Sequence, residues 1–239
     1  MVSKPSVSVV MATYNGSKYI REQIISILPQ LEINDELLIS DDGSLDDTIE
    51  IINEVVTYIR PKCEVRIVNG PKNGVIKNFE KLIELASKQI VVFSDQDDIW
   101  DEKKIISIKN AFQKDSKLKV LVHDFETIDS ESNIIINSSI PRFRVGRVRN
   151  LLKNTFIGAS MAARTDFLKY KALPFPDNIP MHDGWIGILA KSNETGFISE
   201  KLTLYRRHEH NLTGSRRSLK SKMLDRLIIL KEVAKKSWR

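Results

Sequence analysis

Short apolar runs alternate with amphipathic helical patterns along the first 129 residues, and this alternation limits the folds open to the chain. Apolar runs typical of buried strands occur at residues 7–16 (ending in polar turn residues), 35–40, 63–69, 90–94 and 119–129. Between them, apolar residues recur at helical spacing at residues 17–30, 49–59, 73–88 and 101–114. Strands that alternate with helices favour an α/β fold with a mostly parallel sheet and helices on both faces.

Charge distribution and cysteine content exclude several classes of protein. The net charge is +6, but residues 206–239 alone contribute +8 and the rest of the chain −2. Because the basic residues gather in the tail, without an aromatic-interleaved basic stripe in the body, we expect no nucleic-acid role. Cys63 is the only cysteine, so no intramolecular disulfide can form. With neither a signal-peptide core nor an apolar run of about 18 residues, a cytoplasmic location is expected.

Polar clusters follow the first, second and fourth predicted strands. They are TYNG at residues 13–16, DDGS at 41–44 and DQDD at 95–98. In open α/β sheets, ligands bind beyond the carboxyl ends of the strands, where parallel strands finish at one edge. We therefore expect one pocket to collect all three clusters.

The acids between Asp95 and Glu102 require a counter-charge. Two carboxylates about 4 Å apart repel by about 4 kcal/mol at a partly buried site. The sequence contains neither GxGxxG nor a P-loop motif, whereas the spacing of Asp95 and Asp97 suits Mg²⁺ or Mn²⁺ between the carboxylates and a diphosphate. A solvated turn is the alternative for this pair. For Asp101 and Glu102, we expect only a complement to the dipole of the following helix.

Three motifs carry a resemblance to a known family. VSVVMATYNG, LLISDDGSLDDT and IVVFSDQDDIW, in this order, resemble the inverting GT-A glycosyltransferases of family 2. The SDQDDIW variant is similar to rhamnosyltransferase-like members that build bacterial surface polysaccharide. The resemblance runs from about residue 7 to residue 214. It implies a GT-A fold and a metal-dependent enzyme that uses Mn²⁺ or Mg²⁺ and a UDP- or dTDP-sugar donor. The acceptor that it implies is a lipid-linked glycan or an oligosaccharide.

In such enzymes the first two strand ends hold the nucleotide. The resemblance implies that Thr13, Tyr14 and Asn15 contact base and ribose, and that Asp42, with Asp41, accepts from a pyrimidine N–H. An aromatic ring can cover a base and a carboxylate can accept from an imide, so the chemistry agrees. Asp41 and Asn15 are also ordinary turn formers, and that alternative stays open.

The resemblance also implies a set of groups around the diphosphate. Asp95 faces the ribose or the metal, Asp97 binds the metal, and His208 reaches the metal or diphosphate, with Arg206 or Arg207 nearby. Lys77 approaches the diphosphate, or is a plain surface lysine. His208 and His210 would share one face of a strand, so a zinc site is an alternative for that pair.

Sugar transfer needs a base that takes the proton of the acceptor hydroxyl. MHDGW supplies Asp183, which follows a proline-rich stretch and precedes Gly184, as expected for a loop that enters a helix. The family's usual Glu-Asp pair is here His182-Asp183, and a helix N-cap is the alternative role for the aspartate. We assign the acceptor or sugar side of the site to Asp98, Trp100, His182 and Trp185. Packing beneath the site is the alternative for the tryptophans, and a merely structural role is the alternative for His182.

The chain is interpreted as one GT-A domain with a helical tail. Residues 1–100 form the nucleotide-binding half, residues 101–214 the acceptor-side half, and residues 215–239 a basic amphipathic helix. Apolar residues recur along that helix at Leu219, Met223, Leu227, Leu230, Ala234 and Trp238. Such a helix commonly lies on an anionic membrane surface, here the inner face of the plasma membrane, and docking on the enzyme body or a second subunit is the alternative. The sequence leaves the oligomeric state open.

The leading hypothesis is transfer of a single sugar, because the Gln/Arg-x-x-Arg-Trp signature of processive synthases is absent. Two alternatives belong to other classes. One is a non-catalytic module that binds a nucleotide sugar, and the other is a metal-dependent phosphohydrolase.

Overall fold

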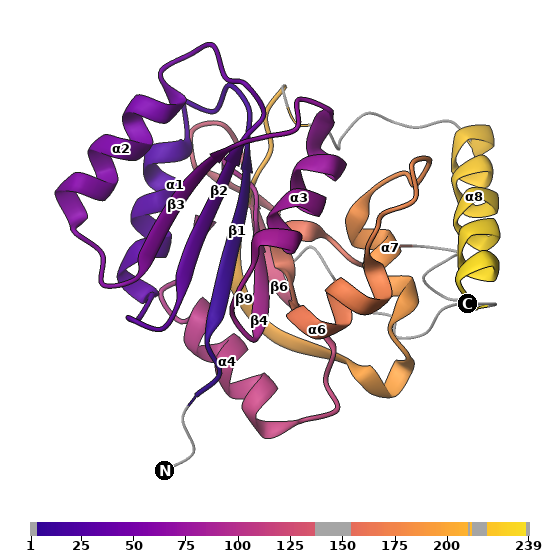
Figure 1. Cartoon of the computed structure of the whole chain (residues 1–239). Helices are drawn as coiled ribbons and strands as arrows, with labels where there is room; N and C mark the ends of the chain where they lie inside the picture. Colours follow the sequence, from indigo (N-terminus) through magenta and orange to yellow (C-terminus); the bar gives the residue numbers. More distant parts are fainter. Residues whose placement is uncertain (1–3, 137–153, 210, 212–218, 238–239) are drawn as a thin grey trace.

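The computed structural model describes residues 4–136, 154–209, 211 and 219–237 (Figure 1). Within these residues nine strands form one sheet in the order β3-β2-β1-β4-β8-β6-β9-β5, with β7 also paired to β6. The strands are β1 (Val7–Thr13), β2 (Glu36–Asp41), β3 (Glu64–Asn69), β4 (Ile90–Ser94), β5 (Ile99–Trp100), β6 (Val120–Ile128), β7 (Ile134–Ile136), β8 (Met161–Arg164) and β9 (Thr195–Arg206). The α-helices are α1 (Ile20–Ile27), α2 (Thr48–Ile59), α3 (Gly74–Leu85), α4 (Lys104–Lys114), α6 (Thr165–Phe167), α7 (His182–Leu189) and α8 (Leu219–Ser237).

The first four strands are parallel, as the sequence predicts. β1 pairs with β2 on one side and with β4 on the other, and β2 pairs with β3. The register sets Thr13 beside Asp41, and Met11 beside Ser94. The carboxyl ends of β1, β2 and β4 therefore finish at one edge, which brings their three polar loops together.

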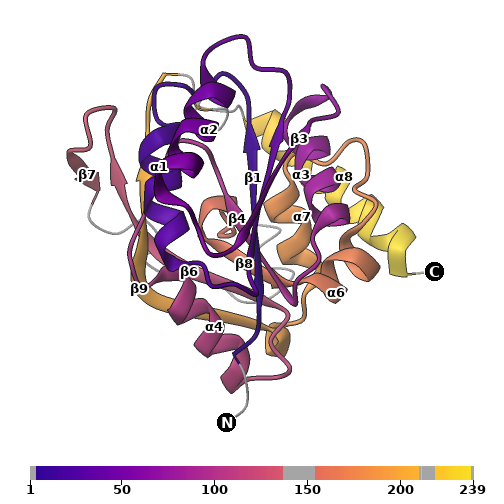
Figure 2. The same ribbon diagram turned by 60° about the vertical axis from the view of Figure 1, so that its left-hand side comes forward.

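Helices cover both faces of the sheet, which confirms the predicted class (Figures 1 and 2). Successive side chains of a strand point to opposite faces, so Val9 and Val10 of β1 enter different cores. The Val9 core includes apolar residues of α1, α2 and α4, and the Val10 core includes those of α3, α6 and α7. Helices α1, α2, α3 and α4 are each held by the apolar stripe that their sequences show.

Beyond residue 119 the sheet is mixed rather than parallel. β8 lies between β4 and β6 and is antiparallel to both. β6 and the long strand β9 are parallel, and β5 pairs antiparallel with β9, with Trp100 opposite Thr203. This pairing carries the DQDD loop to the end of β9, so residues about 110 positions apart in sequence share the site.

Two predicted boundaries shift. α4 begins at Lys104, so Asp101 and Glu102 precede the helix, and Asp101 Oδ1 accepts from the Lys103 N–H at 2.9 Å. The predicted strand at residues 119–129 is followed by a further strand, β7, which pairs with β6. Residues 137–153, which follow β7, lie outside the described residues.

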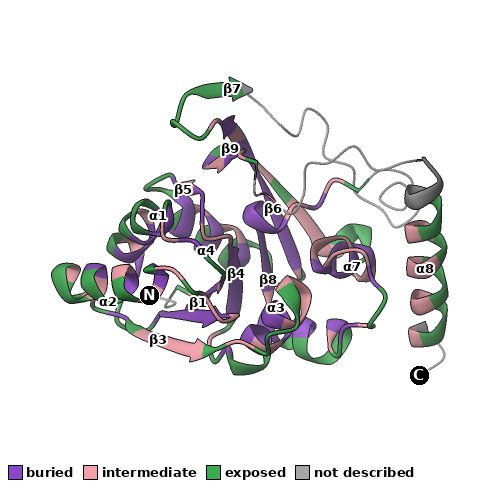
Figure 3. Ribbon diagram, turned by 90° about the horizontal axis from the view of Figure 1, so that it is seen from above, coloured by how far each residue is buried: buried purple, intermediate pink, exposed green. Residues whose placement is uncertain are grey.

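The C-terminal helix α8 lies at the edge of the molecule (Figures 1 and 3). Ile229 and Val233 pack against the core that contains α7, and Lys236 Nζ donates to Ala172 O and Leu173 O at 3.0 and 3.1 Å. The apolar stripe noted in the sequence faces outward instead: Met223, Leu227 and Leu230 are exposed. No helix of the described ranges is long and apolar enough to cross a bilayer.

Candidate active site

The loops after β1 and β2 are tied to each other by side chains of the predicted nucleotide site. Asp41 accepts from Thr13 Oγ1 at 2.9 Å, from Ser44 Oγ at 2.6 Å, and from the N–H groups of Gly43 and Ser44. Asn15 has a φ of 48° and accepts from the Leu45 N–H at 2.8 Å. Both residues therefore shape the turns in which they lie, the second of the two roles considered for them.

Asp42 and Tyr14 lie on the same loops but present different groups. The carboxylate of Asp42 accepts from the N–H groups of Lys72 (2.6 Å) and Gly74 (3.0 Å), which fixes the loop between β3 and α3. Tyr14 is 55% exposed, so its ring can cover a planar base. Gln96 holds the Tyr14 backbone from both sides: its Oε1 accepts from Tyr14 N at 2.9 Å and its Nε2 donates to Tyr14 O at 3.1 Å.

Asp97 and Asp98 of DQDD are buried and are bound to residues at the end of β9, whereas Asp95 is half-buried. His208 Nε2 lies 2.8 Å from Asp97 Oδ2, and Asn211 Nδ2 donates to the same oxygen at 3.2 Å. Asp98 accepts from the Arg206 N–H at 2.9 Å, and its Oδ2 is buried without a hydrogen-bond partner among the described residues. The structure therefore brings the predicted metal ligands Asp97 and His208 into direct contact.

Arg206 is a buried clamp rather than a free cation for a leaving group. Its Nε donates to Asp97 O at 2.8 Å, NH1 donates to Ser132 Oγ at 2.9 Å, and NH2 pairs with Glu22 at 2.6 Å. Its guanidinium also lies 4.7 Å from the ring centroid of Tyr19. Of the two arginines considered for the leaving group, Arg207 is the exposed one.

Burial and mutual repulsion raise the pKa values of the acids. The pKa of Asp95 rises to about 7, first because of burial and then because of the nearby charges of Asp97 and Asp183. Burial also raises the pKa of Asp97, which His208 opposes, and raises that of Asp98 well above its ordinary range. Acids that repel one another in this way bind protons more tightly than usual. A cation bound between them opposes that shift and keeps them ionised.

Asp183 lies in the first turn of α7, where the sequence predicts a loop that enters a helix. Its Oδ2 accepts from the Gly158 N–H at 3.2 Å, and its Oδ1 accepts from the Gly184 N–H. Burial raises its pKa to about 6, although these two hydrogen bonds lower it. Asp183 is close enough to Asp95 to raise the pKa of that residue. A carboxylate with these properties can act as a base near neutral pH.

The aromatic residues assigned to the sugar or acceptor lie in the core. Trp185 is fully buried and donates from Nε1 to Ala172 O at 3.0 Å, and Trp100 is 4% exposed. His182 packs against Phe79 with ring centroids 4.3 Å apart, and burial lowers its pKa to about 3. Stacking on a sugar requires an open ring face, so the structure supports packing as the role of both tryptophans. His182 is likewise a neutral core residue.

Lys77 is engaged in ion pairs. Its Nζ lies 3.0 Å from Glu80 and 3.3 Å from Asp177. The hydrogen bond to Glu80 is the main reason why the pKa of Lys77 is raised. To meet a diphosphate, this ammonium must exchange at least one of these partners.

The donor set suits a hard cation completed by a ligand. Within the described ranges no three histidine, cysteine or acidic side chains are arranged to hold a metal ion by themselves. Asp97 and His208 are nevertheless in contact, Asp95 is beside them, and Asp98 retains an unpaired buried oxygen. A site with few protein ligands fits Mn²⁺ or Mg²⁺ bound together with diphosphate oxygens. His210, the partner of His208 in the zinc alternative, lies outside the described residues.

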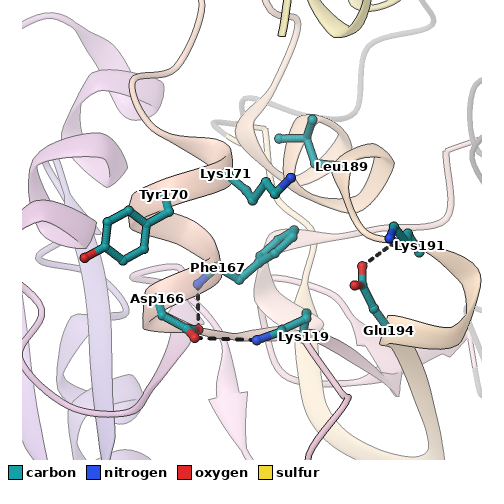
Figure 4. Close-up of a pocket in the computed structure, with 8 residues that line it drawn as sticks. All are labelled: Lys119, Asp166, Phe167, Tyr170, Lys171, Leu189, Lys191 and Glu194. Carbon is teal, nitrogen blue, oxygen red and sulfur yellow. Dashed lines mark hydrogen bonds and ion pairs between the residues drawn. The ribbon is translucent and has the colours of Figure 1, made fainter. Parts of the chain in front are cut away.

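A cavity of about 280 Å³ lies away from these acids (Figure 4). Its lining includes Lys119, which precedes β6, and Asp166 of α6, whose side chains are 3.5 Å apart. β6 is antiparallel to β8, which is antiparallel to β4, so β6 starts at the edge where β4 also starts. The cavity is therefore at the amino edge of the sheet, opposite the predicted donor site.

Several residues of the site have no motif that sequence reasoning could use. Gln96 is the variable position between two acids, Asn211 follows the His-x-His pair, and Lys104 is one lysine in a charged helix start. Lys104 is fully buried, and burial lowers its pKa to about 7 while Asp98 and Asp95 oppose the shift. The sequence did contain one signal of this burial: Lys104 falls on the same helical face as Ile105, Ile108 and Phe112, which is the buried face of α4.

These features define an α/β protein that gathers three polar loops, several acids and Asp183 near one sheet edge. The sequence comparisons specify the family. The model described as "Glycosyl transferase family 2" matches residues 8–170. The chain is 31% identical over 229 residues to dTDP-rhamnosyl transferase RfbG of Shigella flexneri, covering 89% of this chain and 76% of that protein. The chain therefore belongs to glycosyl transferase family 2 and is a glycosyltransferase.

A second relative and two solved structures extend the comparison. The chain is 26% identical to the Escherichia coli UDP-Glc:alpha-D-GlcNAc-diphosphoundecaprenol beta-1,3-glucosyltransferase WfgD, covering 83% of this chain and 77% of that one. Staphylococcus aureus TarS 1–349 with UDP-GlcNAc has a TM-score of 0.71 at 19% identity, covering 95% of this chain and 66% of that one. Mycobacterium tuberculosis glucosyl-3-phosphoglycerate synthase with Mn²⁺, UDP and phosphoglyceric acid has a TM-score of 0.62 at 17% identity, covering 97% and 78%. These structures share the GT-A fold.

Proposed function

We propose that this protein is a metal-dependent inverting glycosyltransferase that moves one sugar from a UDP- or dTDP-sugar to a lipid-linked or oligosaccharide acceptor. The process it serves is the synthesis of bacterial cell-surface polysaccharide. The proposal rests on the proximity of Asp183 to Asp95, which is close enough for its charge to raise the pKa of Asp95, because it places a candidate base beside the proposed diphosphate-metal site. The names of the relatives, a dTDP-rhamnosyl transferase and a diphosphoundecaprenol-dependent glucosyltransferase, support this donor and acceptor class.

The nucleotide is held in the first half of the chain, residues 1–100. The exposed ring of Tyr14 covers the base, and Thr13 and Asn15 shape the loop that meets base and ribose. Asp42 accepts from the pyrimidine N–H, and Asp41 keeps the loop in place through its four hydrogen bonds. Lys77 approaches the diphosphate once it leaves Asp177, the more exposed of its two partners.

Asp95, Asp97 and His208 are the residues that hold the metal. Bound Mn²⁺ or Mg²⁺ supplies positive charge that neutralises the leaving nucleoside diphosphate. The presence of Mn²⁺ and UDP in a solved structure of similar fold supports this assignment. Asp98 and Arg206 stay beneath the site and keep the DQDD loop in its position.

Asp183 is the catalytic base, and it belongs to the acceptor-side half, residues 101–214. The oxygen of an acceptor hydroxyl attacks the anomeric carbon from the side opposite the diphosphate. The bond from that carbon to the diphosphate oxygen breaks, and Asp183 takes the hydroxyl proton. Backside attack inverts the anomeric centre. The N–H groups of Gly158 and Gly184 hold the carboxylate in one orientation for this transfer.

The test is a donor and acceptor screen with two matched variants. Purified wild type is incubated with Mn²⁺, UDP- and dTDP-sugars and a lipid-diphosphate-linked sugar, and the product and its anomeric configuration are read by mass spectrometry and NMR. Asp183→Asn is expected to bind donor but not transfer sugar. Asp97→Asn is expected to lose Mn²⁺-dependent donor binding as well. Release of sugar without acceptor would favour a phosphohydrolase, and binding without any turnover would favour a non-catalytic module.

The C-terminal helix is the part of the chain that contacts the inner face of the plasma membrane. Met223, Leu224, Leu227 and Leu230 are exposed on α8, and Lys231 and Lys235 are exposed beside them. Apolar and basic residues on one surface suit an anionic bilayer. We expect the protein to co-sediment with vesicles that contain anionic lipid, and we expect Leu227→Ser and Leu230→Ser to reduce the fraction that sediments. Equal sedimentation of these variants would contradict membrane contact.

A further inference from the structure

A buried lysine beneath the acids has no partner of opposite charge at hydrogen-bond distance among the residues that the structure describes. Lys104, the first residue of α4, is fully buried. Its Nζ donates to Ala159 O at 2.9 Å and to Thr203 Oγ1 at 2.8 Å, and it lies 3.9 Å from the ring centroid of Trp100. The ammonium group therefore has a carbonyl, a hydroxyl and an aromatic face as its three partners.

These contacts join three segments that are far apart in sequence. Ala159 belongs to the tight turn Gly158–Ser160, Trp100 to β5 beside the DQDD loop, and Thr203 to β9, which leads to Arg206 and His208. The turn is one that also serves the base, because the Gly158 N–H donates to Asp183 Oδ2. The ammonium group of Lys104 thus holds Ala159, and the neighbouring residue Gly158 orients the proposed base, Asp183.

The same charge is directed at the acids. The ammonium of Lys104 lowers the pKa values of both Asp95 and Asp98 by Coulomb attraction. On the other side, it lowers the pKa of His123 on β6, which burial already depresses, so that histidine stays neutral. When protonated, Lys104 is consequently a positive charge beneath the acid cluster, with a neutral imidazole behind it.

Packing alone does not account for a lysine at this position. Placing an ammonium in a core costs free energy, and an apolar side chain of similar volume often packs there without loss. α4 provides a comparison: Lys109 is also buried, but it forms an ion pair with Asp35 at 2.7 Å. Asp35 precedes β2, so that pair lies at the amino edge of the sheet and away from the acids.

We infer that Lys104 is a positioning residue for the transfer reaction, which holds the Gly158–Ser160 turn against β9 so that Gly158 orients the carboxylate of Asp183. The inference rests on the proposed function, since it assigns Asp183 as the base. It predicts that loss of the ammonium slows the chemical step more than it weakens the binding of donor, because the nucleotide loops after β1 and β2 make no hydrogen bond to Lys104 among the contacts of the described residues.

The experiment compares Lys104→Met with Lys109→Met in the full chain, with Mn²⁺, a donor accepted by the wild type, and acceptor. Both variants lose a buried ammonium of the same helix. For Lys104→Met, we expect kcat to fall by about tenfold to 100-fold, since a shift of about 1 Å at a catalytic group can cost about 100-fold. Its KM for donor is expected to change by less than about threefold. Lys109→Met is expected to melt at a lower temperature, with kcat unchanged.

A second variant keeps the test decisive where Lys104→Met does not fold. Thr203→Val removes one of the two oxygen acceptors, but leaves the ammonium and its charge in place. We expect a smaller decrease in kcat in the same direction, again with little change in KM. If Lys104→Met folds and has the wild-type kcat, the inference is overturned and the proposed function stays intact. If only Thr203→Val folds, a wild-type kcat in that variant has the same consequence. A wild type that transfers no sugar overturns the proposed function first, and this inference with it.

Discussion

Replacement of Asp183 by Asn separates the catalytic role of this residue from its effect on stability. The half-buried carboxyl group of Asp183, whose pKa rises from 3.8 unfolded to about 6 folded, binds its proton more tightly in the folded state. Between these values the folded protein therefore holds more protons, and stability falls as pH rises. Above pH 6, ionised Asp183 costs the fold up to about 3 kcal/mol, at 1.36 kcal/mol for each pKa unit.

Asn carries no charge at any of these pH values, so the variant escapes this cost. It does lose a hydrogen-bond acceptor, because only one of its two side-chain atoms can receive the N–H groups of Gly158 and Gly184. That loss is about 1–3 kcal/mol and does not depend on pH. The difference in the free energy of unfolding, variant minus wild type, is therefore expected to grow by up to about 3 kcal/mol between pH 4 and pH 7. Asp95 adds to the difference in the same direction, since Asp183 raises its pKa too.

Urea unfolding of both proteins without metal, from pH 4 to pH 7.5, measures this difference. Transfer by the wild type should decline about tenfold from its plateau by pH 5, where only about a tenth of Asp183 is ionised. The variant should lose about 100-fold to 10,000-fold in kcat, the usual contribution of a general base. A stability difference that stays constant across this pH range would show that the carboxyl group is not buried with a raised pKa. Transfer by the variant at the wild-type rate would show that Asp183 is not the base.

Three further predictions follow from single side chains. Arg206→Leu is expected to lower the free energy of unfolding by about 3–5 kcal/mol, because Arg206 is 1% exposed and holds the DQDD loop, whereas Arg21→Leu breaks an exposed ion pair and should cost below about 1 kcal/mol. Equal urea midpoints for the two variants would contradict the clamp. Tyr14→Ala is expected to raise the KM for donor about tenfold or more by removal of base stacking, with a smaller change in kcat, and steady-state kinetics measures both. Burial raises the pKa of the Cys63 thiol to about 11, so mass spectrometry should show little alkylation at pH 8 unless urea is present.

The sequence predicted the first half of the fold because local periodicity controls it. Runs such as residues 35–40 and 90–94 favour buried strands of a parallel sheet because they are short and alternate with helical stripes, and those stripes indicate helices that cover the sheet on both sides. The antiparallel insertion of β8 between β4 and β6 was not predictable in this way. The pairing of β8 depends on which strand edge is free when the chain returns, and no local pattern encodes that choice.

For the site, the sequence identified the acids and the family resemblance supplied their proposed roles. Acidic loops at the ends of parallel strands must meet at one edge, so the convergence of the loops that contain Thr13, Asp41 and Asp95 follows from the order of elements. The sequence did not determine which of these side chains are free to contact a ligand. Asp41 proved to be occupied by its own turn, and Trp100 and Trp185 proved to be core residues.

The sequence by itself therefore determined the sheet edge at which the polar loops meet, because local patterns identify the parallel strands and the carboxyl ends of parallel strands share one edge. Only the tertiary structure decided that the chain around residue 206 returns to clamp the DQDD loop, and that Lys104 is buried under it. Burial and charge contacts between residues about 50 to 110 positions apart depend on how the whole sheet closes. The pKa shifts of Asp95 and Asp183 depend on such long-range contacts, and a pattern of neighbouring residues in the sequence does not predict them.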